Sequence, residues 1–116
     1  MNEEDEMARG SEVLHCYSRL AQYASSMAAL AVARDWGRLP ELELNCAVMI
    51  ERLKGLPAPE TLPEQLRDEA RVLIQRIRAD QETVVQLVRP QLQSLLSNMG
   101  TLNAQKNLSD AYGGTH

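Results

Sequence analysis

The longest periodic pattern of hydrophobic positions in this sequence runs from Thr61 to Leu96. Its apolar residues recur at spacings of three, four or seven, which is the pattern of one helix face. They are Leu66, Ala70, Leu73, Ile77, Val84, Val88 and Leu95. The pattern predicts a helix over residues 62–99. Such a helix is too long for a small compact domain unless other long helices pack against it.

Local signals mark the ends of this long helix. Thr61 and Glu64 have the spacing of a capping box, and Pro63 would lie in the first turn, where the missing N–H of proline costs little. Pro90 interrupts the pattern, but apolar residues continue beyond it, so we expect a kink or short break there. Gly100 is the expected end of the helix.

Two further stretches have helical periodicity. The first covers residues 11–34, where Ser11 is a suitable N-cap and several alanines would let a neighbouring helix approach closely. The second covers residues 38–54, with Pro40 in its opening turn and Gly55 just beyond its end. The prolines of the following loop separate it from the long helix, and the short loop makes the two helices antiparallel neighbours.

The two ends of the chain have weaker patterns. Residues 1–10 carry an acidic cluster and no apolar face, so we expect a flexible tail. Residues 104–112 predict a short fourth helix, which needs a docking surface to be stable. The predicted fold is therefore all-α. It is a single domain over residues 11–116, an antiparallel three-helix bundle or hairpin with a long kinked third helix and a short C-terminal fourth helix.

Composition supports this fold and narrows the function. The 116 residues contain no phenylalanine and only four aromatic residues, which favours helices packed by aliphatic side chains. A formal charge of −4 argues against a nucleic-acid binder, and no apolar run is long enough for membrane insertion. Cys16 and Cys46 lack disulfide or metal-site spacing and indicate buried thiols in a reducing compartment. With an acidic N-terminus in place of a basic secretory signal, the expected location is the cytoplasm.

No catalytic or metal-binding constellation can be assembled from the sequence, so we expect no enzyme, no metal and no cofactor. His15 is the only internal histidine and is expected at a boundary or partner-facing position. Asp80 and Glu82 are two residues apart and point to different sides of a helix, so they cannot share a substrate. A protein partner is the better expectation.

Four segments make the chain resemble the small all-helical flagellar export chaperones of the FliT type. They are DWGRL (35–39), ADQE (79–82), RPQLQSL (89–95) and QKNLSDAYG (105–113). The resemblance implies a cytoplasmic type III export chaperone. Such a chaperone binds the C-terminal helical region of the flagellar filament-cap protein, prevents its premature assembly and delivers it to the export apparatus. The implied partners also include the export ATPase and, for some members, the master activator of flagellar transcription, which they dampen.

The resemblance also implies a client groove along the second and third helices, covered by the terminal short helix. On this chain the groove residues are Met49, Ile50, Leu53, Leu73, Ile77, Val84 and Val88. The cover residues are Leu108, Ala111 and Tyr112. An open groove of this kind is expected on a monomer or a weak homodimer.

Two other functions need only an apolar helical face and stay open. One is a helical adaptor or dimerisation module whose long stripe pairs with its own copy. The other is a regulator that binds a transcription factor without any role in export. The size of the protein in solution separates the first from a chaperone, because a tight dimer would occupy the groove.

Overall fold

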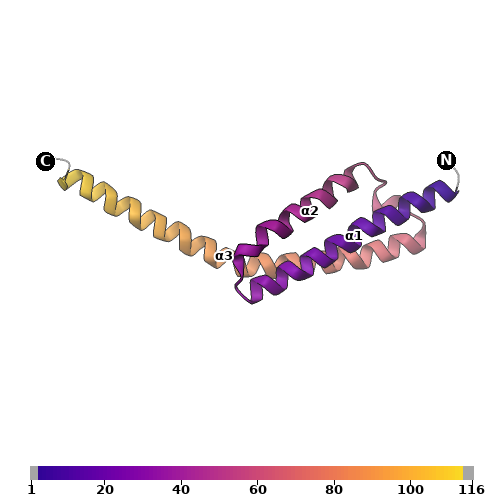
Figure 1. The fold of residues 1–116 in the computed structure, drawn as a ribbon, viewed down its shortest axis with the longest axis horizontal. Helices are drawn as coiled ribbons and strands as arrows, with labels where there is room; N and C mark the ends of the chain where they lie inside the picture. Colours follow the sequence, from indigo (N-terminus) through magenta and orange to yellow (C-terminus); the bar gives the residue numbers. More distant parts are fainter. Residues whose placement is uncertain (1–2, 114–116) are drawn as a thin grey trace. The chain divides into compact units, whose positions relative to one another are not determined.

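The computed structural model describes the backbone of residues 3–113 and the side chains of residues 3–100. Within that part the chain forms helices joined by short turns and no strand, which confirms the all-α prediction. The elements are α1 (Glu3–Val32), the 3₁₀ helix η1 (Trp36–Arg38), α2 (Leu39–Lys54), the 3₁₀ helix η2 (Pro59–Thr61) and α3 (Glu64–Gly113) (Figure 1). The chain divides into two compact units, Met1–Val84 and Val85–His116.

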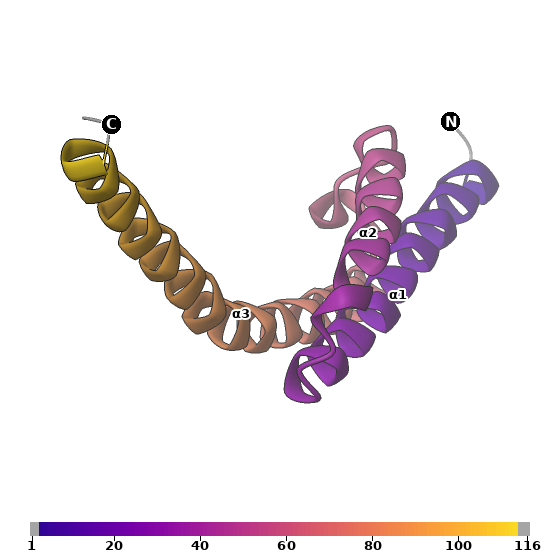
Figure 2. The same ribbon diagram turned by 60° about the vertical axis from the view of Figure 1, so that its left-hand side comes forward.

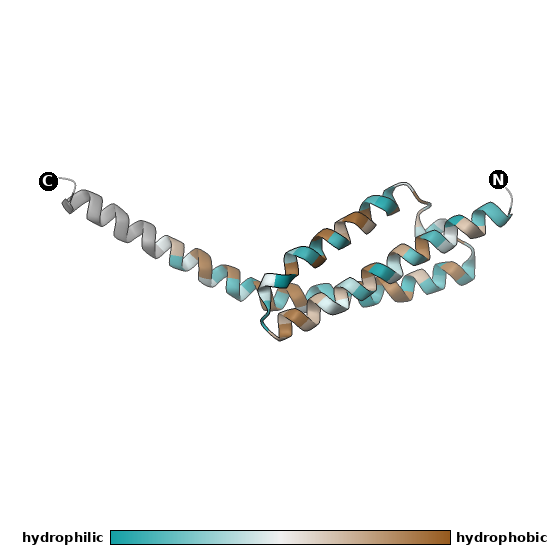
Figure 3. Ribbon diagram, viewed as in Figure 1, coloured by the Kyte–Doolittle hydropathy of each residue, from teal (hydrophilic) through white to brown (hydrophobic). Residues whose placement is uncertain are grey.

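The first unit contains three helical segments, α1, α2 and the first part of α3. Helix α2 runs antiparallel to α1, and the first part of α3 runs in the same direction as α1 (Figures 1 and 2). Hydrophobic residues recur along α1 and α2 between hydrophilic ones (Figure 3). The buried hydrophobic residues of the first unit form two clusters: one is built on Val13, Leu62 and Leu66, and the other on Cys16, Leu20 and Met49.

Helix α1 begins at Glu3, eight residues earlier than the sequence predicted. The structure therefore places residues 3–10 in a helix instead of a flexible tail. Gly10 is buried in α1, and a Cβ atom at this position would lie 2.7 Å from Leu66 Cδ1. The absence of a side chain thus allows α1 to lie directly against α3. The acidic residues of the first turn also interact favourably with the positive end of the helix dipole.

Small residues line the buried side of α1, as the sequence predicted. Ala21, Ala24, Ala28 and Ala31 are all buried, and Ala31 is fully inaccessible to solvent. Alanine side chains let helix axes approach closely, because no larger group separates the backbones. The buried alanines of this stretch therefore mark the face of α1 that packs against its neighbours.

Helix α1 ends in a Schellman turn. The N–H of Asp35 donates to the carbonyl of Leu30 at 2.9 Å, and the N–H of Arg34 donates to Ala31 at 3.1 Å. Arg34 takes a φ of 59°, the left-handed conformation that this turn requires and that glycine usually supplies. The turn leads directly into η1 and reverses the chain for α2.

The start of α3 differs from the predicted capping box. The hydroxyl of Thr61 donates to the carbonyl of Ala58 at 2.7 Å and so belongs to η2, while α3 begins at Glu64. Leu62 is extended, with ψ of 156°, because a residue that precedes proline is disfavoured in the helical region. The helix therefore begins only after Pro63, whose carbonyl accepts the N–H of Arg67 at 2.8 Å.

The sequence predicted a kink or short break at Pro90 and an end at Gly100, and α3 continues past both positions as one element. Pro90 lies inside the helix, which loses the backbone hydrogen bond that proline cannot donate but remains one element. Gly100 does not take the positive φ of a helix C-cap, and α3 runs on to Gly113. The segment 104–112 is consequently part of α3 and not a separate fourth helix.

Candidate functional site

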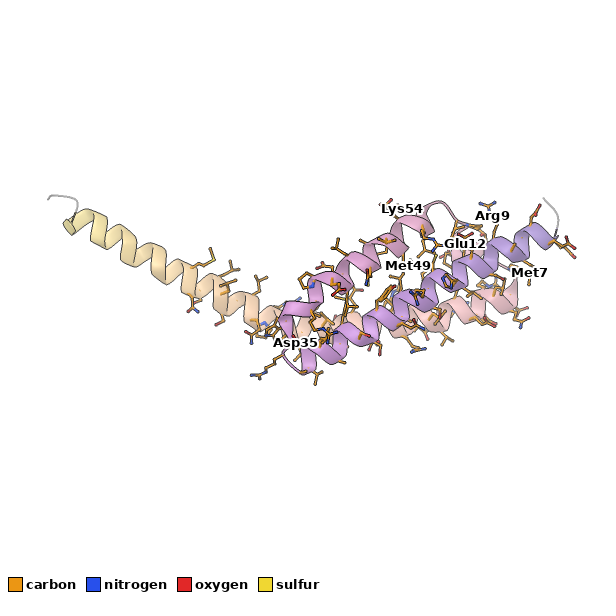
Figure 4. The ribbon with its side chains drawn as sticks, in the orientation of Figure 1. Met7, Arg9, Glu12, Asp35, Met49 and Lys54 are labelled. Atoms are coloured by element: carbon orange, nitrogen blue, oxygen red, sulfur yellow. The ribbon has the colours of Figure 1, made fainter. Side chains whose placement is uncertain are left out.

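Three of the predicted groove residues meet at one place in the first unit. Met49 is buried against Cys16 and Leu20 of α1, on the side of α2 that faces α1 (Figure 4). Leu53 of α2 and Ile77 of α3 are half-buried and pack against the same cluster. We call Leu53 and Ile77, together with the cluster beneath them, the apolar junction. At this place α1, α2 and α3 all contribute side chains to one cluster.

The other predicted groove residues have different positions. Ile50 is 48% exposed on α2, beside the apolar junction in sequence but outside its core. Leu73 and Val84 are half-buried on the part of α3 that belongs to the first unit. Val88 is half-buried but belongs to the second unit. The predicted cover residues Leu108, Ala111 and Tyr112 lie outside the described side chains.

Several large apolar side chains outside the predicted site are exposed. In the second unit, Leu92, Leu95, Leu96 and Met99 are each 50% exposed or more. On α2, Leu44 is 69% and Val48 is 56% exposed. Their helical spacing is visible in the sequence, but that spacing cannot tell a buried face from an open one.

Two ion pairs on α1 and α2 are solvent-exposed. Arg52 of α2 donates to Glu12 Oε1 of α1 at 3.2 Å, and each side chain is 45% exposed. Lys54 pairs with Glu51 at 2.7 Å within α2. Exposed pairs of this kind contribute about 1 kcal/mol or less to stability. Apolar packing therefore contributes more than these ion pairs to holding α2 against α1.

Two titratable groups next to the apolar junction have a raised pKa. Burial raises the pKa of the Cys46 thiol, and the negative charge of Glu43 adds to the shift. Burial also raises the pKa of Tyr17, with smaller contributions from Glu60 and Cys16. Both groups are held in their neutral forms at neutral pH, which suits an apolar contact surface and not a nucleophile.

Neither metal chemistry nor membrane insertion is indicated in the described part of the chain. No group of three or more His, Cys, Asp or Glu side chains among these residues could hold a metal ion. None of the described helices combines the length and the apolar character that crossing a bilayer requires. Two surface hollows of about 420 and 390 Å³ lie away from the apolar junction. They are lined by Glu6, Arg9, Pro57, Thr61, Leu62 and Pro63, and by Ser26, Ala29, Leu30, Arg38, Glu41 and Leu42.

The comparison with known families gives a match over nearly the whole chain. A family model described as "Flagellar protein FliT" matches residues 14–114. The chain belongs to the FliT family. This membership makes it a flagellar protein, in agreement with the resemblance of its sequence segments.

Individual FliT proteins are similar to this chain at modest identity. The "Flagellar protein FliT" of Pectobacterium carotovorum is 27% identical over 106 residues, which cover 91% of this chain and 84% of that protein. The FliT of Pectobacterium atrosepticum is 26% identical over the same length and shares. The FliT of an Enterobacter species is 24% identical over 94 residues, or 81% of this chain and 78% of that protein. No solved structure matches the chain.

Proposed function

We propose that this FliT-family chain is a cytoplasmic export chaperone of the flagellar type III system. Its client is the C-terminal helical region of the filament-cap protein, which it keeps unassembled and delivers to the export apparatus. The apolar junction is the observation that carries the proposal. Half-buried Leu53 and Ile77 from two helices border one cluster, so a client helix can bury further apolar area there.

The same surface accounts for the other proposed partners. The export ATPase and the master activator of flagellar transcription would bind through helices as well, and the activator would be dampened while bound. A partner that uses the apolar junction must exclude the client, because one surface accommodates one helix at a time. Competition between the client and either partner is therefore part of the proposal.

Calorimetry with the C-terminal helical region of a cap protein from the same organism tests the proposal. Saturable one-to-one binding is expected. Ile50→Asp places a charge at an exposed edge of the predicted groove and should abolish binding while the helical circular dichroism is unchanged. Val72→Asp is the matched control, because Val72 is 57% exposed on α3 and lies outside the predicted groove. Absence of binding both by the unmodified chain and by a chain lacking residues 101–116 would refute the client assignment.

Ile77→Asp and Val84→Asp examine the α3 side of the groove. If these side chains line the groove, the variants fold and lose the client. If they belong to the core, the buried charge unfolds the protein, and circular dichroism reveals it. Ile77→Ala then serves as the milder variant, since it removes contact area without introducing a charge.

We further propose that the C-terminal segment, residues 101–116, competes with the client for the groove. Support comes from the family resemblance of residues 105–113. A tethered competitor acts at an effective concentration in the millimolar range, so even weak docking would reduce client affinity. Deletion of residues 101–116 should therefore tighten binding to at least one partner. Equal or weaker binding to all partners would refute this regulation.

The second candidate function is a dimerisation module, and the exposed apolar residues of the second unit favour it. Leu92, Leu95 and Met99 are spaced by three and four residues, as in the seam of a coiled coil. A dimer that persists on dilution in size-exclusion chromatography would support this alternative. A monomer, or a dimer that dissociates at low micromolar concentration, would support an open client groove.

A further inference from the structure

Three arginines follow one side of the first part of α3. Arg67, Arg71 and Arg78 are separated by four and seven residues, which places them on one face of a helix. We call these three residues the arginine flank. They extend for about 17 Å along the helix axis, or roughly three turns. The chain as a whole is acidic, with a formal charge of −4, so this row of cations is a local exception.

The charges of the arginine flank are poorly neutralised within the described residues. Arg78 is exposed on the surface and has no ion pair there. Arg71 contacts Asp68 at 3.7 Å, but both side chains are about 60% exposed, and so the contact is weak and easily exchanged. Glu64 and Glu82 lie beyond the two ends of the flank, and Glu82 already takes part in another interaction. At Arg71 and Arg78, an incoming carboxylate therefore meets guanidinium groups that can rearrange at little cost.

Arg67 provides the observation that points to an acceptor. Its side chain is half-buried, and its Nε atom is fully covered without a hydrogen-bond partner. A buried donor without an acceptor is unfavourable, and a guanidinium binds a carboxylate with two parallel hydrogen bonds. Because this Nε atom is covered, a partner carboxylate reaches it only when the Arg67 side chain turns outward, and that movement would give the N–H the acceptor it lacks.

The arginine flank adjoins the apolar junction. Ile74 shares the face of Arg67, Arg71 and Arg78, and it is half-buried. It also lies three residues before Ile77, which packs on the junction. A helix seated on the junction would therefore lie with one edge along the arginines.

We propose that the arginine flank selects partners whose amphipathic helix carries carboxylates along one edge, in register with Arg67, Arg71 and Arg78. This inference rests on the proposed function, because it assumes that a helix docks on the apolar junction. What is new is that the docked helix carries carboxylates along one edge. The apolar side supplies the contact area, and the acidic edge sets the register and excludes helices with a basic edge.

The probes are the cap-protein segment and two designed helical peptides of about 18 residues. The peptides share one apolar face and differ only along one edge, where one carries glutamates and the other carries lysines. The full chain should bind the glutamate peptide at least about tenfold more tightly than the lysine peptide at low ionic strength. The difference should shrink in high salt, because exposed charges are screened.

One charge-reversal variant in the arginine flank, with a matched control, tests whether the flank causes this preference between the peptides. Arg78→Glu should weaken binding of the glutamate peptide by about fivefold or more and strengthen binding of the lysine peptide. Arg76→Glu is the matched control, since Arg76 is exposed on the same helix but two residues away and so on a different side. Circular dichroism should show that both variants fold, because both side chains lie at the surface.

The outcomes separate this inference from the proposed function. If the cap segment or the peptides bind, but Arg78→Glu and Arg76→Glu behave alike, the inference is overturned and the groove remains. The same holds if the lysine peptide binds as tightly as the glutamate peptide. If neither the cap segment nor a peptide binds, both proposals fail. Selective loss with Arg78→Glu, and inversion of the peptide preference, establishes the acidic-edge partner.

Discussion

The contact between Gly10 and Leu66 gives the most direct test of how α1 packs on α3. A Cβ atom at position 10 would lie 2.7 Å from Leu66 Cδ1 and 3.5 Å from Leu62 Cδ2. The first distance is far below van der Waals contact, so Leu66 would have to move. Leu66 is only 8% exposed and belongs to the cluster with Val13 and Leu62, which leaves it little room.

Two opposing effects decide the stability of the Gly10→Ala variant. Alanine is favoured over glycine inside a helix by about 1 kcal/mol. Overpacking a well-filled core costs about 1 to 3 kcal/mol. The sum of the two effects predicts that Gly10→Ala lowers the free energy of unfolding by roughly 1 kcal/mol. At a solvent-exposed helix position, the same substitution would raise it.

A second substitution separates the two effects. Leu66→Val shortens the side chain that a Cβ at position 10 would meet, so Gly10→Ala in that background should recover the helix preference and stabilise by about 1 kcal/mol. The effect of Gly10→Ala should thus differ between the two backgrounds by roughly 2 kcal/mol, a large coupling for one pair. Urea unfolding monitored by far-UV circular dichroism measures all four proteins of the cycle.

Gly37→Ala is the control for these measurements. A Cβ atom added at Gly37 would meet no other atom within 4 Å, so Gly37→Ala should change stability by less than about 0.5 kcal/mol. If Gly10→Ala stabilises the protein equally in both backgrounds, Gly10 does not contact α3. Residues 3–10 would then be the solvated tail that the sequence pattern predicted.

Three further predictions follow from single residues. Arg34→Gly should stabilise the protein by about 1 kcal/mol, because φ of 59° is costly for arginine and not for glycine; an unchanged urea midpoint would contradict the Schellman turn. Ala28→Leu should cost about 1 to 3 kcal/mol, and Ala29→Leu on the exposed side less than about 0.5, as compared by thermal unfolding. Because the pKa of Cys46 is raised in the folded state, its stabilising contribution is complete below the thiol pKa of the unfolded chain, about 8.5, and declines as pH rises above it. A Cys46→Ala variant should show a weaker alkaline decline than the parent.

The amphipathic helices follow from the sequence because their signals are local. The residues that bound α2, Leu39 and Lys54, lie within one residue of the predicted ends, since Pro40 and Gly55 act through the backbone of their own segment. Met49, Leu53 and Ile77 also follow from periodicity, because a helix has only one way to place residues at these spacings on one face.

The departures arise where a local preference is overridden by packing or by a neighbour. Gly10 is unfavourable inside a helix, so the sequence pattern starts α1 after it, yet the missing side chain is what allows the approach of Leu66. Thr61 has the identity of a cap, but Pro63 forces Leu62 into an extended conformation and moves the helix start to Glu64. These outcomes depend on groups that only meet in the folded chain.

The sequence by itself determined that this protein is helical, where its main apolar faces lie and to which family it is similar. Periodicity and composition suffice for that, because they act within each segment. Only the tertiary structure decided that Leu53 and Ile77 share one cluster, that Leu92 and Met99 stay exposed, and that Arg67 has a covered Nε atom without a partner. Each of these depends on which other helix lies alongside, and the pattern of a single helix carries no information about its neighbour.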